Sequence, residues 1–181
     1  AAFSSGVLSS HSVTITHTGD FTIRATRTGG TESGLSNTFT VNPAALSNFL
    51  VEASGGGGDI QPPTAGVPFE IRITARDQYN NTVASFTGTV QITSNSDLTG
   101  ASVTSDAFVA GVLASQSVTI SSAQLGTTLS ASGPGGANGT SNGFTVNPAG
   151  LGNFLITSNA DTNIGTQTAG VPFGIKITAR D

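Results

Sequence analysis

Apolar and polar residues alternate along most of this chain, which predicts β-strands that bury one face. In FEIRITARD, Phe69, Ile71 and Ile73 fall on one side of an extended chain, and Glu70 and Arg72 fall on the other. No segment of ten or more residues carries a helical stripe. The alternation recurs in NFLVEAS (48–54), GTVQITS (88–94), SVTIS (117–121), TTLSAS (127–132) and GFTVN (143–147). We therefore expect an all-β chain.

Turn-forming stretches separate the predicted strands and set their spacing. They are SGGGGDIQPP, DQYNN, SNSDLTG, SSAQLG and SGPGGANG. About seven short strands within about 105 residues are typical of an antiparallel sandwich. We expect its core to contain Phe69, Ile71, Ile73, Val90, Ile92, Phe108, Val118, Ile120, Leu129, Phe144 and Val146, with Phe86 as a further aromatic anchor.

Two long segments occur twice and define a repeat. FTVNPAALSNFLV at 39–51 returns as FTVNPAGLGNFLI at 144–156, and the step from Phe39 to Phe144 is 105 positions. TAGVPFEIRITARD at 64–77 returns at 168–181 with an offset of 104. The repeat predicts the C-terminal part of one unit at 1–43, a complete unit at 44–148, and the N-terminal part of another at 149–181.

The order of these segments resembles the bacterial immunoglobulin-like repeats that occur in tandem in very large cell-surface proteins. The resemblance rests on LSNFLVEA, TAGVPFEIRITARDQYNNTV, FTGTVQITS, FVAGVLASQSVTI, TLSASG and SNGFTVNPA. It implies a Greek-key sandwich strung head to tail as a stalk or fibre, and it implies no general catalytic residue. The Cys, Trp and Cys of the antibody core are absent from this sequence, as is usual in such bacterial repeats.

The Asn-Pro-Ala segments mark the predicted junctions between units. FTV is expected to be the last strand of one sandwich, and LSNFLV the first strand of the next. Pro43 and Pro148 fix φ near about −65°. They also bias Asn42 and Asn147 toward extended geometry. We therefore expect short, semi-rigid junctions in an array where each unit contacts mainly adjacent repeats, and neighbouring copies as further partners in a fibre.

Composition narrows the class of function. A net charge of −4, from 6 Lys and Arg against 10 Asp and Glu, argues against nucleic acid as a partner. No apolar run approaches the ~20 residues of a membrane helix, so we expect no membrane insertion in this segment. Cysteine is absent, and the one lysine, Lys176, lies outside 44–148, so neither disulfides nor lysine isopeptides staple that unit. Few charges and many hydroxyls favour an extracellular or cell-surface location.

One loop offers candidate metal ligands. Asp77 and Asn80 belong to DQYNN, whose carboxylate and amide oxygens are groups that calcium prefers. The same residues are typical of a turn in which Asp and Asn bond to nearby backbone. Because the other carboxylates of 44–148 are scattered, we favour the turn. Apart from this calcium candidate we expect no cofactor.

Other motifs are weaker. The glycine run 55–58 lacks the Lys and Ser or Thr of a phosphate-binding loop. His11 and His17 lie outside the complete unit, so we predict no enzyme. Tyr79 is the only tyrosine and there is no tryptophan, which leaves little for stacking on a sugar. Asn80 and Asn138 each begin a three-residue N-glycosylation pattern.

Two functions remain open at this point. The first is a structural repeat of an extracellular bacterial fibre or filament, and the second is an adhesin module that binds a host, a glycan or a neighbouring cell.

Each terminal part would expose half a core and open strand edges. Either the chain is cut from a longer repetitive polymer or neighbouring chains complete it by strand addition. We favour the former, because two complementary ends would still lack FTGTVQITS (86–94).

Overall fold

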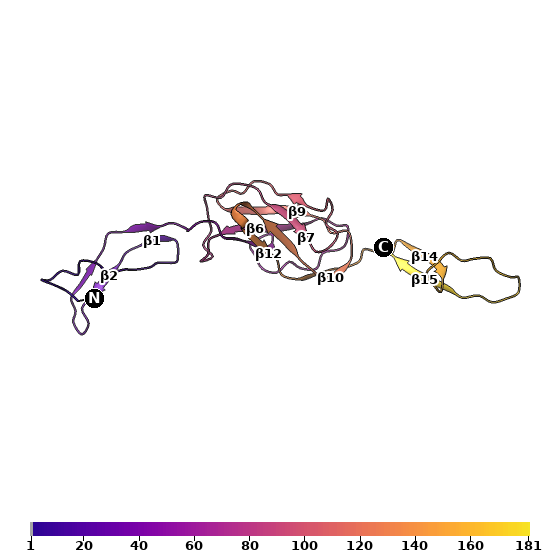
Figure 1. Cartoon of the computed structure of the whole chain (residues 1–181), viewed down its shortest axis with the longest axis horizontal. Helices are drawn as coiled ribbons and strands as arrows, with labels where there is room; N and C mark the ends of the chain where they lie inside the picture. Colours follow the sequence, from indigo (N-terminus) through magenta and orange to yellow (C-terminus); the bar gives the residue numbers. More distant parts are fainter. Residues whose placement is uncertain (1) are drawn as a thin grey trace.

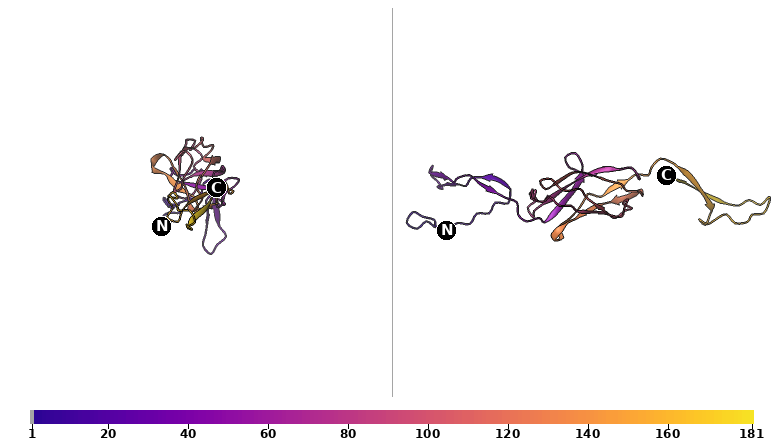
Figure 2. Two further views of the ribbon diagram at one scale, coloured as in Figure 1. Left: turned by 90° about the vertical axis from the view of Figure 1, so that its right-hand side faces the viewer. Right: turned by 90° about the horizontal axis from the view of Figure 1, so that it is seen from above.

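The computed structural model describes residues 2–181 and shows an elongated molecule with a compact centre and a thin flank at each end (Figure 1). Two further views show the same arrangement (Figure 2). The described residues form β-strands, turns and one 3-10 turn at Pro134–Gly136. No helix among them is long and apolar enough to cross a membrane. The all-β class is therefore confirmed.

The centre consists of nine strands, most of them in one sheet. The sheet has the order β8-β7-β11-β12-β5-β6-β9, and its neighbours are antiparallel except β12 and β5, which meet in parallel at Asn138 and Asn48. A further pair joins β10 to β13. The strands are β5 (Asn48–Ala53), β6 (Phe69–Arg76), β7 (Gln91–Ser94), β8 (Val103–Thr104), β9 (Val112–Val118), β10 (Gln124–Thr127), β11 (Leu129–Ser132), β12 (Asn138–Thr140) and β13 (Phe144–Val146).

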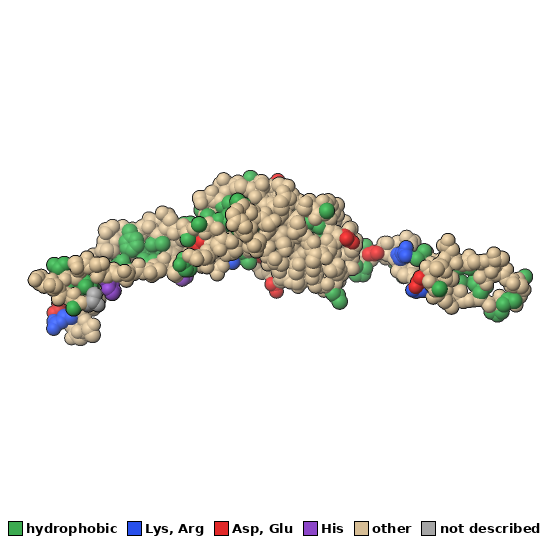
Figure 3. Space-filling model, viewed as in Figure 1, with side chains coloured by type: hydrophobic (Ala, Val, Ile, Leu, Met, Phe, Trp, Pro, Cys, Tyr) green, Lys and Arg blue, Asp and Glu red, His purple; other side chains and the backbone are tan. Residues whose placement is uncertain are grey.

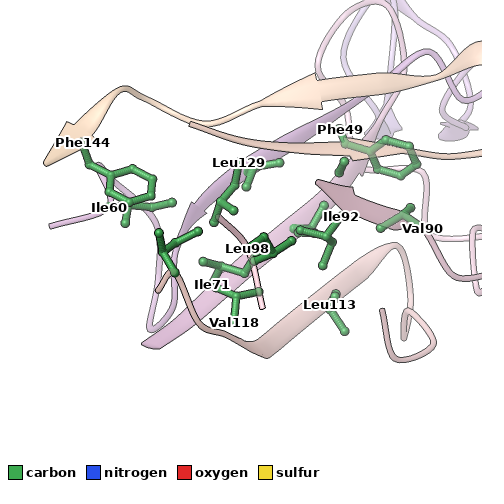
Figure 4. Close-up of a cluster of buried hydrophobic side chains, with 14 of the residues drawn as sticks. Phe49, Ile60, Ile71, Val90, Ile92, Leu98, Leu113, Val118, Leu129 and Phe144 are labelled. Carbon is green, nitrogen blue, oxygen red and sulfur yellow. The ribbon is translucent and has the colours of Figure 1, made fainter. Parts of the chain in front are cut away.

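The core lies between the β5-β6-β9 half of this sheet and the β7-β11 half. Ile71 on β6 lies in one cluster with Ile92 on β7 and Leu129 on β11 (Figure 4), and these three and Ile73 are fully buried. Each such side chain contributes about 1.5–3 kcal/mol by leaving water. Of the predicted core residues, Phe69 is half-buried and the rest are buried, namely Ile71, Ile73, Val90, Ile92, Phe108, Val118, Ile120, Leu129, Phe144 and Val146.

Five phenylalanines anchor the two ends of this core. At one end the ring centroids of Phe49 and Phe86 are 5.5 Å apart, and those of Phe86 and Phe108 are 4.9 Å apart, both edge-on. At the other end Phe69 and Phe144 meet edge-on at 5.9 Å. Edge-to-face pairs of this kind add stabilisation beyond the area that they bury. Aromatic packing therefore takes the place of a disulfide in a chain that has no cysteine.

The first flank, residues 2–41, contains two strand pairs that match pairs in the centre. Its strands β1 (Gly19–Phe21) and β4 (Phe39–Val41) pair as β10 and β13 do, and β2 (Arg24–Thr26) pairs with β3 (Ser33–Leu35) as β11 does with β12. The registers agree once the centre is allowed one additional residue in β10, where the ladder shifts and Gly126 takes φ +68°. Two hydrogen bonds recur as well. Ile23 N donates to Ser36 Oγ at 2.8 Å, as Leu129 N does to Ser141 Oγ at 3.0 Å. In return Ser36 N donates to the Ile23 carbonyl, and Ser141 N donates to the Leu129 carbonyl, each at 2.9 Å.

The last flank, residues 149–181, is one long hairpin. Its strands β14 (Asn153–Ser158) and β15 (Ile175–Arg180) pair at six positions, from Asn153 with Arg180 to Ser158 with Ile175. These pairs reproduce the six pairs of β5 with β6 position by position. Both flanks therefore form the strand pairs that their sequences form in the centre, without the remaining strands that cover those pairs there.

Candidate functional site at the Asn-Pro-Ala junction

The junction between the first flank and the centre is built around a buried aspartate. Asp77 follows β6 directly and exposes 0% of its surface. Its Oδ2 accepts the backbone N–H of Ala44 at 2.9 Å, and its Oδ1 accepts the N–H groups of Tyr79 and Asn81, each at 2.9 Å. The Asn81 side-chain amide donates to Oδ2, also at 2.9 Å. One carboxylate therefore holds both its own loop and the start of the centre.

The local sequence explains this geometry. An aspartate that begins a loop can accept N–H groups two and four residues later, which shapes a tight turn. Asn80 takes the left-handed conformation with φ +66°, which asparagine tolerates better than most residues. Pro43 has no N–H, so Ala44 provides the first backbone donor after the proline. Asp77 accepts that donor.

The carboxylate of Asp77 is stabilised as an anion by hydrogen bonds. Burial alone would raise its pKa, but the Asn81 side chain and the backbone amides of Ala44, Asn81 and Tyr79 outweigh burial and lower the pKa from 3.8 to about 2. The ion pairs among residues 2–181 join other side chains, so these donors are dipoles rather than cations. Asp77 is therefore ionised at neutral pH.

Contacts beside Asp77 extend the clamp to the neighbouring backbone. Asn48 Nδ2 donates to the carbonyl of Asp77 at 3.2 Å, and Ser47 N donates to the carbonyl of Arg76 at 2.8 Å. These bonds continue the β5-β6 ladder past its last strand pair. The chain that leaves the junction is consequently fixed to the end of β6 before β5 begins.

Asn81 connects the same loop to the first flank. Its Nδ2 donates to the carbonyl of Thr16 at 2.7 Å, and its Oδ1 accepts the N–H of Thr18 at 3.3 Å. A single amide side chain therefore binds the backbone of residues 16–18 and Asp77 at once. We call Asp77, Asn81 and the backbone groups that they bind the junction clamp.

The second junction repeats part of the clamp. Ala149 N donates to Asp181 Oδ2 at 2.8 Å, as Ala44 does to Asp77, and Gly152 N donates to the Arg180 carbonyl at 2.8 Å, as Ser47 does to Arg76. Asp181 is exposed, whereas Asp77 is buried. The Asp-to-Ala bond therefore forms wherever the chain places TARD beside Asn-Pro-Ala.

The structure places the four predicted junction residues at the borders of the centre. Asn42 and Pro43 precede the clamp at one border. At the other, Asn147 N donates to the Pro63 carbonyl at 2.8 Å and its own carbonyl accepts Ala65 N at 2.8 Å, so Pro148 begins the chain beyond the sheet. Sequence reasoning found these residues but missed Asp77 as their partner. The sequence contained a signal for this contact, because each copy of Asn-Pro-Ala is followed by a copy of TARD that ends in an aspartate, Asp77 or Asp181.

The other sequence candidates lie apart from one another. Both carboxylate oxygens of the calcium candidate Asp77 already accept N–H donors, and no group of three or more His, Asp or Glu residues within 2–181 is placed to hold a metal ion. The His17 ring lies within hydrogen-bond distance of its neighbour, with Thr16 Oγ1 3.5 Å from its Nδ1, and His17 is exposed. Tyr79 is half-exposed on the clamp loop. The geometry therefore serves to fix backbone segments to one another.

Comparison of the chain with protein-family models, with curated proteins and with solved structures gave no match. The functional argument accordingly uses the residues and their geometry. In the view of Figure 3 most of the surface of the centre is uncharged, and acidic and basic side chains gather where the centre meets the last flank.

Proposed function

We propose that this chain is a segment of tandem immunoglobulin-like repeats in an extracellular bacterial fibre or stalk, where it provides reach and mechanical support. The observation that carries the proposal is the repeated junction: the Asp-to-Ala hydrogen bond and the β-ladder next to it recur at both Asn-Pro-Ala segments. A repeated junction with fixed geometry is what a load-bearing array of similar units requires.

The strand order supports the proposed fold. β5, β6 and β9 lie together, and β8, β7, β11 and β12 lie together, with β5 and β12 joining the two sets. This grouping corresponds to the two sheets of a seven-stranded immunoglobulin-like sandwich. The chain enters the centre at one end and leaves it at the other (Figure 1), which suits units that transmit tension along a line.

An adhesin module is the second candidate, and the described surface favours it less. A binding module needs one distinctive patch, such as clustered aromatic residues or charges. Tyr79 is the only tyrosine and is isolated, and the ion pairs are scattered between the flanks and the centre. The junctions recur, whereas no comparable patch does.

Cryo-electron microscopy of the native material tests the proposal. We expect filaments or stalks whose axial repeat corresponds to one or two sandwiches joined by short junctions. Compact particles without an axial repeat would reject the structural proposal. Beaded strings that carry a distinct tip would confirm a stalk and would move the search for an adhesin to that tip.

A further inference from the structure

The chain segments that enter and leave the centre run side by side in the same direction. We call residues 44–65 the entry segment and residues 138–147 the exit segment. Their strands β5 and β12 meet in parallel at Asn48 and Asn138. A second parallel bridge, farther along both segments, joins the entry segment to Asn147. Because the chain enters the centre at one end and leaves it at the other (Figure 1), the two segments overlap along the length of the centre.

The backbone of Asn147 holds the far end of the entry segment. Its N–H donates to the Pro63 carbonyl at 2.8 Å, and its carbonyl accepts the N–H of Ala65 at 2.8 Å. Ala65 is itself buried in the core. Asn147 directly precedes Pro148, where the chain leaves the sheet. The last residue of the exit segment is therefore bonded through both of its backbone groups to the entry segment.

The side chain of Asn142 adds a further link between the two segments. Its Oδ1 accepts the N–H of Ile60 at 2.8 Å, and its Nδ2 donates to the Ile60 carbonyl at 3.3 Å. An amide side chain offers both an acceptor and a donor, so it can take the place of a backbone partner in a strand ladder. Ile60 is buried in the core. We call the bonds of Asn142 and Asn147 to residues 60–65 the shear contact.

Tension along the chain would load the shear contact in a particular direction. It would pull the entry segment at Ala44 toward the first flank and the exit segment at Asn147 toward the last flank. Since the segments are parallel and leave the centre at opposite ends, they would have to slide past each other along their length. Hydrogen bonds between strands lie across that direction, so the bonds along the overlap bear the load together. End strands that left from the same end would instead open one bond at a time.

We propose that the shear contact carries the tension that passes through the centre. The inference deepens the proposed function, and it rests on that proposal for the direction of the load. It assigns Asn142 a role that equilibrium stability alone does not reveal, because its two bonds to Ile60 join the loaded segments directly.

Asn95 provides a matched control for Asn142. Its Nδ2 donates to the Gly126 carbonyl at 3.0 Å, and its Oδ1 accepts the N–H of Thr128 at 2.8 Å. This amide therefore binds backbone through one donor and one acceptor, as Asn142 does. Its partners belong to neither the entry segment nor the exit segment. Asn95→Ala and Asn142→Ala should accordingly cause similar losses of stability in urea denaturation, where no load acts.

Single-molecule force spectroscopy of the whole chain tests the proposal. The chain has no cysteine of its own, so handles can be attached through Thr38→Cys and Gly150→Cys, which lie just outside the centre on either side. At constant force we expect Asn142→Ala to unfold at least about fivefold faster than Asn95→Ala, because only the former loses hydrogen bonds from the loaded contact. If Asn142→Ala does not fold, Asn142→Asp takes its place, with Asn95→Asp as its control.

A second pulling direction shows whether the effect depends on the direction of load. Handles at Thr104→Cys in β8 and Ser117→Cys in β9 pull on the two edge strands of the sheet. We expect the two variants to unfold at equal rates in this direction. Equal rates along the chain, or the same difference in both directions, would overturn the proposal.

The force experiment and microscopy can fail independently. An axial repeat together with equal unfolding rates along the chain would reject the shear contact and retain the fibre. Faster unfolding of Asn142→Ala along the chain without an axial repeat would retain the shear contact and reject the fibre.

Discussion

At the scale of single residues, Asp77 is the side chain that most clearly links sequence to junction geometry. It is buried, ionised at neutral pH and bound by four N–H donors from three residues. A carboxylate can accept all four bonds because it carries no proton. This requirement explains why aspartate, rather than the similarly shaped asparagine, suits the position.

Asp77→Asn should weaken the clamp. One carboxylate oxygen becomes an NH₂ group that faces N–H donors, and a buried donor without an acceptor is costly. We expect the Tm of the centre to fall by about 5 °C in calorimetry. Asp59→Asn is the matched control, because Asp59 is exposed and its side chain accepts none of the described hydrogen bonds. A Tm unchanged from that of the control would contradict the clamp.

The pKa of Asp77 predicts how stability depends on pH. Its folded value is about 2 and its ordinary value is 3.8, so the folded state favours the charged form. Stability from this group is complete above pH 3.8 and is lost as pH falls from 3.8 toward 2. We expect the Tm of the unmodified chain to fall more steeply across this window than that of Asp77→Asn. If the Tm of both proteins falls equally with pH, other carboxylates account for the pH dependence of stability.

At the scale of elements, the parallel contact between β12 and β5 joins the two halves of the centre. It depends on Gly139, whose missing side chain lets β12 approach Phe49. The alternating pattern predicted most strands of the centre, because each buries one face. It did not predict this parallel pairing, since the contact joins residues 48 and 138 through backbone fit rather than through a repeated apolar pattern.

Gly139→Ala should loosen that contact. The added methyl group overlaps the Phe49 carbonyl, so backbone must move, at a cost of about 1–3 kcal/mol in the free energy of unfolding. Urea denaturation of the whole chain measures the change. Gly34→Ala is the matched control, because the same position in the first flank is open. If Gly34→Ala loses as much free energy of unfolding as Gly139→Ala, the loss comes from the strand itself and not from its contact with Phe49.

At the scale of the whole molecule, the junctions decide how the flanks are presented. Pro43 limits rotation and the junction clamp binds the segments on both sides of it. The proposed fibre depends on this restricted geometry. A flexible tether would give the flanks a wide range of directions and would weaken the fibre.

Pro43→Gly should widen the distribution of orientations of the first flank. Spin labels on cysteines placed at the exposed positions Thr28 and Ser132 would report the width of the distance distribution. We expect a broader distribution with stability changed by no more than about 0.5 kcal/mol. Pro62→Gly, in an exposed loop away from the junction, is the control. A width equal to that of the control would show that the clamp alone sets the orientation.

The sequence by itself determined the strand class, the repeat of about 105 residues and the predicted core, because period-two alternation and recurring segments are local signals. It also located Asn42, Pro43, Asn147 and Pro148. Only the tertiary structure decided that Asp77 clamps Ala44, that Asn81 binds the first flank, and that β7 and β8 lie at an edge. The contacts of Asp77 with Ala44 and of Asn81 with Thr16 join residues 33 and 65 positions apart, and the groups bound are backbone N–H and C=O groups, which carry little information about residue type.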